Sequence, residues 1–291
     1  MAMKYFRQPT IGLVVFSFIS GFLLAGCMVA STAGNEKEAD SLNLSLYQAA
    51  QDFSKRSDHA NAVNYYRKLY QRDAKVVKVV VGLASSLRHL QQTPEAQAII
   101  LRALKDAPKD IDLRAELGKV QLALGEPLKS IQSLSLVDAE IDGARWDIKV
   151  ALAVAYDRIA MYDQAERRYR QALELSPENP VIMNNFSLSL AQAGNLSEAL
   201  KILERAAALP EATPRMRQNL AMLYALKGNL PMAEKYVRRD MPTKIADQNM
   251  AYYRNLWTKL KTDTDFVQKL LEKSNVAVVQ GSAFGLDGYF R

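Results

Sequence analysis

The chain of 291 residues has few of the side chains on which metal and redox chemistry depends, with one cysteine and two histidines. A lone cysteine excludes a disulfide within the chain and leaves no cluster of ligands at metal-site spacing. His59 and His89 are expected to be surface residues that do not meet as a ligand pair. No nucleophile–base pair and no glycine-rich phosphate loop is present. We therefore expect no enzyme activity, no metal, no cofactor and no small-molecule substrate.

A strong excess of charge of one sign is also lacking. Lysine and arginine total 38 against 31 acidic residues, which gives a net charge of +7. The basic residues are spread along the chain rather than gathered on one face, as a nucleic-acid partner requires. Pairs such as Arg167-Arg168 are expected on solvated helix faces. The composition therefore argues against nucleic-acid binding.

The chain has no hydrophobic run long enough to span a bilayer comfortably. Its longest apolar stretch, residues 11–24, falls short of the roughly 20 residues that a transmembrane helix needs. Lys4 and Arg7 precede this stretch, and Ala25 and Gly26 follow it. A basic start, a short apolar run and small residues form the layout of a secretory signal.

Cys27 directly follows the small residues, and this arrangement resembles a bacterial lipoprotein signal. The resemblance implies that residues 1–26 are removed and that Cys27 is acylated, which would also remove a reactive free thiol. An ordinary signal peptide and a signal anchor are the alternatives. Met28, in place of aspartate, implies in that family a lipid anchor in the outer membrane that faces the periplasm. Residues 27–42 then form the lipidated cysteine and a flexible tether.

The rest of the chain contains a repeated unit of 34 residues, with one extra residue before Trp146. Units begin at Asn43, Val77, Ile111, Trp146, Pro180 and Pro214. The eighth position is always small: Ala50, Ala84, Gly118, Ala153, Ser187, Ala221. The twentieth is small as well: Ala62, Ala96, Ser130, Ala165, Ala199, Ala233. This pattern resembles the tetratricopeptide repeat, a helix-turn-helix unit.

The residue types explain the pattern physically. Small side chains allow two helices to approach, and a larger apolar residue four positions later lies on the same helix face. Gly125, Gly194 and Gly228 all occupy position fifteen, where a helix ends in a left-handed residue. We therefore predict an all-α, right-handed superhelical solenoid of about six repeats.

The chain is predicted to have five segments in all, of which the signal segment 1–26 and the tether 27–42 are the first two. The repeats occupy residues 43–247, because no unit buries its core alone and stacking supplies the stability. Capping helices follow at 248–272, the first over Asn249–Leu260 with Trp257 in the capping core and another over Asp265–Glu272. A tail at 273–291 follows, for which disorder and strand addition to a partner are both open.

The tetratricopeptide family binds partners in a concave groove lined by positions 2, 5, 9, 12 and 13 of each unit. The resemblance implies these groove residues: Val150, Val154, Asp157, Asn184, Leu188, Gln192, Arg215, Gln218, Met222, Leu226. The alternative is that the capping helices fill this groove. The second unit offers a more basic set: Lys78, Val81, Ser85, Arg88, His89. The family's clamp for chaperone tails is not reproduced here.

One stretch resembles a particular group of tetratricopeptide lipoproteins. Residues 215–222, 225–229, 238–242 and 249–254 follow one another as in the TadD-like proteins of the tight-adherence (Flp) pilus. This resemblance implies an outer-membrane protein that helps the pilus secretin to assemble or localise, in the manner of a pilotin, with protein partners in the secretin or other Tad machinery. The alternative is a periplasmic lipoprotein adaptor that docks cell-wall hydrolases or proteases.

Overall fold

The computed structural model describes residues 40–262, and every element in that range is a helix. The described part of a first helix covers residues 40–55. It is followed by α2 His59–Arg72, α3 Val77–His89, α4 Thr93–Asp106, α5 Ile111–Ala123, α6 Pro127–Glu140, α7 Trp146–Asp157, α8 Tyr162–Leu175, α9 Pro180–Gln192, α10 Leu196–Ala208, α11 Pro214–Leu226, α12 Leu230–Asp240 and α13 Thr243–Thr262. The signal segment 1–26, Cys27, Asp265–Glu272 and the tail 273–291 lie outside the described residues.

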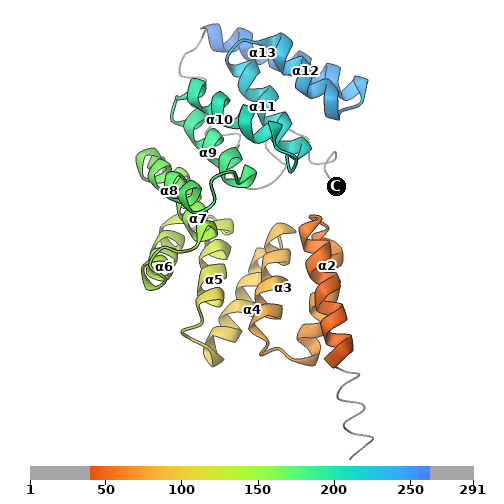
Figure 1. Ribbon diagram of the computed structural model, residues 1–291, viewed down its shortest axis with the longest axis vertical. Coiled ribbons are helices and arrows are strands. Elements are labelled where there is room, and N and C mark those ends of the chain that lie inside the picture. The colour runs from red at the N-terminus through yellow and green to blue at the C-terminus, as the bar shows by residue number, and fades with distance from the viewer. Residues whose placement is uncertain (1–39, 263–291) are drawn as a thin grey trace, which may run out of the picture.

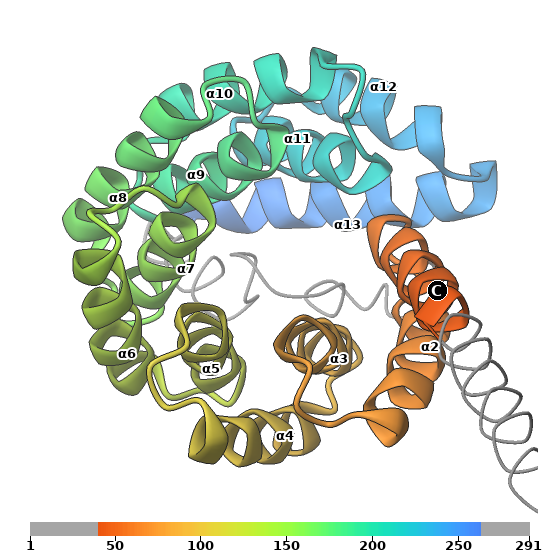
Figure 2. The same cartoon turned by 60° about the horizontal axis from the view of Figure 1, so that its bottom comes forward.

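The helices pair and stack into a curved solenoid (Figure 1). Seen from its end, the first helices of successive pairs, α3, α5, α7, α9 and α11, form the inner layer (Figure 2). The second helices, α4, α6, α8, α10 and α12, form the outer layer. The predicted all-α tetratricopeptide solenoid is thereby confirmed. No helix within residues 40–262 is long and apolar enough to cross a membrane.

The second to sixth units begin where the repeat pattern places them. Helices α3, α5, α7, α9 and α11 start at the first residue of each predicted unit. The alanines at the helix crossings, such as Ala84, Ala153 and Ala221, are fully buried. At Gly118 an added Cβ would lie 2.5 Å from Cγ of Leu134, so only glycine permits this approach of α5 to α6. The small positions therefore set the spacing between helices.

Position fifteen is left-handed in every unit, whether or not it is glycine. Gly125, Gly194 and Gly228 have φ angles of +78°, +89° and +83°. The three other units carry Ser57, Gln91 and Ala160 there, with φ of 60°, 63° and 56°. Because non-glycine residues enter this region at a cost, the packing of each repeat imposes the turn on them.

Two helices overlap the bounds of the predicted segments. The described part of the first helix includes residues 40–42, which the prediction assigned to the tether. The cap begins earlier than 248, because α13 is continuous from Thr243. The carbonyl of Pro242 accepts hydrogen bonds from the N–H groups of Ile245 and Ala246, which starts this helix directly after α12.

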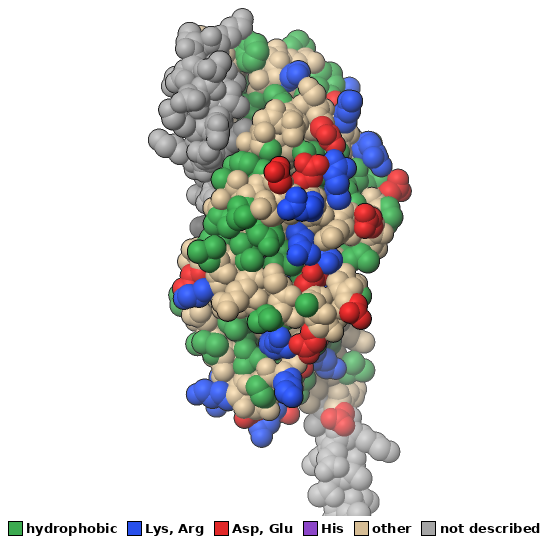
Figure 3. Space-filling model, turned by 90° about the vertical axis from the view of Figure 1, so that its left-hand side faces the viewer, with side chains coloured by type: hydrophobic (Ala, Val, Ile, Leu, Met, Phe, Trp, Pro, Cys, Tyr) green, Lys and Arg blue, Asp and Glu red, His purple; other side chains and the backbone are tan. Residues whose placement is uncertain are grey.

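Helix α13 closes the end of the solenoid by packing against α11 and α12. Trp257 lies over Gly228, whose added Cβ would be 2.4 Å from the indole ring. Trp257 packs against the main buried cluster, as expected for a capping residue. The outer face over α6, α8 and α10 carries acidic and basic side chains interspersed with apolar ones (Figure 3).

The extra residue before Trp146 lies in a special junction between repeats 3 and 4. The loop turns through Asp142 and Gly143, with φ angles of 50° and 67°. It covers a buried ion pair in which Nζ of Lys149 lies 2.9 Å from Oδ2 of Asp138. An added Cβ on Gly143 would lie 2.5 Å from this Nζ. A small buried apolar cluster spans the junction, joining Leu134 and Val137 of α6 to Ile148 and Leu152 of α7.

Candidate partner-binding cleft

The inner surface of the first three repeats is hollowed by a cleft of about 790 Å³. Its walls come from the helix at 40–55, from α3 and from α5, the three first helices of these repeats. Tyr47, Val77 and Val81 supply apolar lining, while Lys78 and Glu116 supply charge. The cleft therefore combines an apolar surface with polar groups, as binding sites for extended segments do.

The apolar floor is held in place by tyrosines. Tyr66 is buried and its ring lies against Gly82, where an added Cβ would be 2.5 Å from Cζ. Tyr47 meets Tyr66 edge to face, with ring centroids 6.0 Å apart. Nζ of Lys78 lies 4.8 Å from the centre of the Tyr47 ring, a cation–π distance. Gly82 is thus the residue that gives the cleft its depth.

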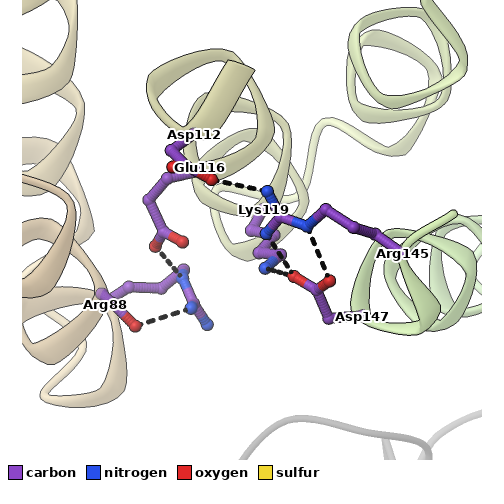
Figure 4. A network of polar contacts seen from close by, with 7 residues as sticks. Arg88, Asp112, Glu116, Lys119, Arg145 and Asp147 are labelled. Carbon is purple, nitrogen blue, oxygen red and sulfur yellow. Dashed lines mark hydrogen bonds and ion pairs between the residues drawn. The ribbon is translucent and has the colours of Figure 1, made fainter. Parts of the chain in front are cut away.

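A chain of ion pairs fixes one wall of the cleft (Figure 4). Nε of Arg88 on α3 lies 2.9 Å from Oε1 of Glu116 on α5, and Glu116 is only 4% exposed. Nζ of Lys119, also on α5, lies 2.7 Å from Oδ2 of Asp147 on α7. These pairs link α3, α5 and α7, the first helices of three successive repeats, and hold the wall together in the unbound protein.

Arg145 completes this chain by contacting two carboxylates. Its guanidinium lies 2.9 Å from Asp147 and 2.5 Å from Asp112. Burial of Asp147 raises its pKa, but hydrogen bonds from Arg145 and Lys119 outweigh this and lower the pKa to about 2. Asp147 therefore stays ionised at neutral pH and keeps the wall together.

The two histidines lie in contact: His89 is a surface residue as expected, whereas His59 is half-buried. The imidazole rings of His59 and His89 are stacked with centroids 4.2 Å apart and planes 5° apart. His59 starts α2 and lines the cleft, and His89 ends α3. The two histidines are 30 residues apart, at position seventeen of one unit and position thirteen of the next. The alignment of the repeats could therefore have predicted that they are neighbours.

The predicted groove residues of repeats 4 to 6 do not form an open surface. All of them except Gln192 and Arg215 are buried, and Leu188 and Met222 are each 2% exposed. The apolar ones belong to one cluster with Met250 and Tyr253 of α13, so the cap contributes to this core: Val150, Val154, Leu188, Met222, Leu226. The open part of the inner face is in repeats 1 to 3, and a binding role for the repeat 4 to 6 residues stays a prediction.

Asp157 illustrates why these positions are internal. Its carboxyl accepts hydrogen bonds from Tyr169 Oη at 3.0 Å and Ser189 Oγ at 2.7 Å. Burial raises its pKa to about 7, although both hydrogen bonds act in the opposite direction. Asp157 thus joins α7, α8 and α9 as a structural residue.

Within residues 40–262, no group of three or more histidine, cysteine, aspartate or glutamate side chains is arranged to hold a metal ion. Two charged groups of the cleft, Glu116 and Lys119, are engaged in helix-to-helix ion pairs. The cleft offers apolar contact, hydrogen bonds and charge to a ligand.

A family model described as "Tetratricopeptide repeat" matches residues 54–117 and 160–223. Among curated proteins, the chain is 36% identical over 117 residues to the uncharacterized protein y4yS of Sinorhizobium fredii. That match covers 39% of this chain and 63% of y4yS. It is 35% identical over 91 residues to the TPR repeat-containing thioredoxin TTL4 of Arabidopsis thaliana, covering 31% of this chain and 13% of TTL4. The chain thus spans less than two thirds of either relative.

Among solved structures, the fold is similar to that of PilW, described as a widely conserved type IV pilus biogenesis factor. The superposition has a TM-score of 0.56, covers 68% of this chain and 91% of PilW, and the two sequences are 15% identical. At this identity the likeness concerns the fold alone.

Proposed function

We propose that this chain, a tetratricopeptide-repeat solenoid, is a scaffold that captures an extended segment of a pilus-assembly protein in the cleft of repeats 1 to 3. The observation that carries the proposal is the open cleft itself. Its apolar floor and rigid polar wall lie on the inner face of the solenoid, and a preformed surface lowers the entropic cost of binding. The role is binding and assembly rather than catalysis.

The shape and chemistry of the cleft suit a peptide that lies across three helices. Val77 and Val81 offer apolar contact for side chains of the bound segment. Ser54 and Ser85 offer hydroxyl groups along the same surface, to which peptide N–H and C=O groups can hydrogen-bond. Affinity then comes from apolar burial, and register comes from the charged wall at Glu116 and Lys119.

Two independent likenesses support a role in pilus assembly. The sequence over residues 215–254 resembles TadD-like lipoproteins, and the fold resembles that of a type IV pilus biogenesis factor. We infer that the partner is the secretin of a tight-adherence pilus or another component of that machinery, and that the chain acts like a pilotin.

The proposed anchor is an acylated Cys27 in the outer membrane, with the solenoid in the periplasm. Several acyl chains hold a protein firmly at a membrane, whereas a single chain does not. Confinement beside the membrane raises the effective concentration of the cleft near its partner without any new contact. Cys27→Ser is expected to lose outer-membrane fractionation, and unchanged fractionation would contradict the lipid anchor.

The proposed function is tested by the state of the secretin in the native host. Membranes from cells with and without this gene are compared on a semi-native gel. Loss of secretin multimers, with secretin monomer still present, supports the assembly role. Normal multimers in the outer membrane contradict it and favour an adaptor that docks cell-wall hydrolases or proteases. Catalytic turnover by the purified protein would contradict a pure scaffold.

A further inference from the structure

We propose that the stacked pair of His59 and His89 is an acid-sensitive latch that holds repeat 1 against repeat 2 and so keeps the cleft in shape. The ring geometry is the main evidence. The two imidazoles come from different helices, lie parallel within 5° and have centroids 4.2 Å apart. Neutral imidazole rings can pack face against face, whereas two charged rings would repel each other.

The pair is placed where its opening would alter the cleft. His59 is itself a lining residue, and Arg88, which precedes His89 on α3, holds Glu116 in the cleft wall. Nδ1 of His59 is buried and has no hydrogen-bond partner among the described residues. Among the described residues, no hydrogen-bond acceptor at this atom therefore stabilises the protonated form of His59.

Among the described residues, the charged groups near the pair are mostly cationic. Asp58, at the start of α2, is the acidic residue that favours a charged His59, and Arg88 on α3 opposes it. His89 faces Arg88, Lys119 on α5 and Arg215 at the start of α11. His89 is an exposed residue, and one face of its ring is covered by the ring of His59.

The direction of the pH effect follows from these neighbours. The pKa of both histidines is lowered below the ordinary value of about 6.5. Burial is the largest cause, and the positive charge of Arg88 is the next largest. As the pH falls through about 6.5, the unfolded or opened segment takes up protons that the stacked pair does not. The opened state therefore gains population on acidification, by up to about tenfold per pH unit for each histidine that must bind a proton.

Hydrogen exchange on the full chain tests the latch without any partner. Exchange of amides in α2 and α3 is measured at pH 7.5 and pH 5.5, corrected for the intrinsic pH dependence, with α12 as an internal reference. We expect the corrected rate to rise in α2 and α3 at pH 5.5 and not in α12. In His89→Phe, whose ring can stack but cannot titrate, the rise should be much smaller.

A second variant and a direct titration complete the test. His59→Phe should behave as His89→Phe does, so a folding defect in one variant does not decide the outcome. In the unmodified chain, the two histidine C2–H resonances should titrate well below 6.5. An equal rise in exchange in both variants and the native chain, or ordinary histidine titration, would overturn the proposal.

The consequence for partner binding rests on the proposed function of the cleft, whereas the latch does not. Cross-linking of the secretin from a photo-reactive group at Val81, compared at pH 7.5 and 5.5, separates the two. A cross-link that weakens at pH 5.5 supports gating by the latch. A cross-link absent at both values contradicts the proposed function, and a pH-independent one contradicts gating.

Discussion

Arg88 and Glu116 are 28 residues apart and form a largely buried ion pair between neighbouring repeats, with Nε 2.9 Å from Oε1. The same separation of 28 recurs in three other pairs between neighbouring units: Arg67–Glu95, Lys119–Asp147 and Arg170–Glu198. In each pair the basic residue comes first. A separation of 28 is therefore a recurring link in this solenoid, and its energetic weight depends on burial.

The Arg88–Glu116 pair should be the most important of these links. Arg88→Met leaves the Glu116 carboxylate buried without its partner, which costs about 3 kcal/mol or more. Arg67→Met is the matched control, because Arg67 and Glu95 have the same spacing and are well exposed; an exposed pair contributes at most about 1 kcal/mol. The free energies of unfolding in urea measure both, and equal losses would contradict the role of burial.

Replacing Ala160 by glycine should stabilise the chain. Ala160 has φ of 56° at position fifteen, where the left-handed conformation costs a non-glycine residue roughly 1 kcal/mol. Glycine relieves this strain, although it also loses more entropy on folding. We expect an increase of a few tenths to about 1 kcal/mol in the free energy of unfolding. Gly194→Ala, at the same position of the next unit, should change stability in the opposite direction.

Leu188→Glu should unfold repeats 4 to 6 rather than weaken a free binding surface. Leu188 is 2% exposed in the main core, where a charge without a partner is very unfavourable. Val81→Glu is the comparison, because Val81 lines the open cleft and is only partly buried. Circular dichroism should show loss of helix for Leu188→Glu and near-native helix for Val81→Glu. The reverse result would indicate that the binding groove lies in repeats 4 to 6.

Asp157 should make the chain less stable as the pH rises towards neutrality. Its pKa is raised by burial from about 3.8 to about 7, so the folded state holds a proton that the unfolded state has released between these values. Stability therefore falls as the pH rises through this window, by at most about 1.4 kcal/mol per unit. Asp157→Asn should flatten this slope in urea unfolding at pH 4.5 to 7.5; an unchanged slope would contradict the assignment.

Much of the fold could be predicted because its signals are local. Prolines at Pro180 and Pro214 mark helix starts, and small residues such as Ala153 mark helix crossings, and the structure places all of them accordingly. The left-handed turns at Gln91 and Ala160 were not predicted, because their side chains give no local sign of a turn that packing imposes.

The site was harder to predict than the fold. Repeat positions identify which side chains face inward, but they do not show whether neighbouring layers cover them. Met222 and Leu188 occupy inward positions and are nevertheless buried with residues of α13. Lys78 and Val81 occupy the same kind of position and line a cleft among the described residues.

The central claim is that the cleft of repeats 1 to 3 receives the partner, and site-specific photo-cross-linking in the native host tests it most directly. A cross-linking amino acid at Val81 or Ser85 lies in the cleft. The same group at Leu128, which is 69% exposed on the outer-layer helix α6, is the control. The account predicts a cross-linked product with the pilus secretin or its assembly partners from Val81 and Ser85 only. Equal products from Leu128, or products from Leu128 alone, would contradict it.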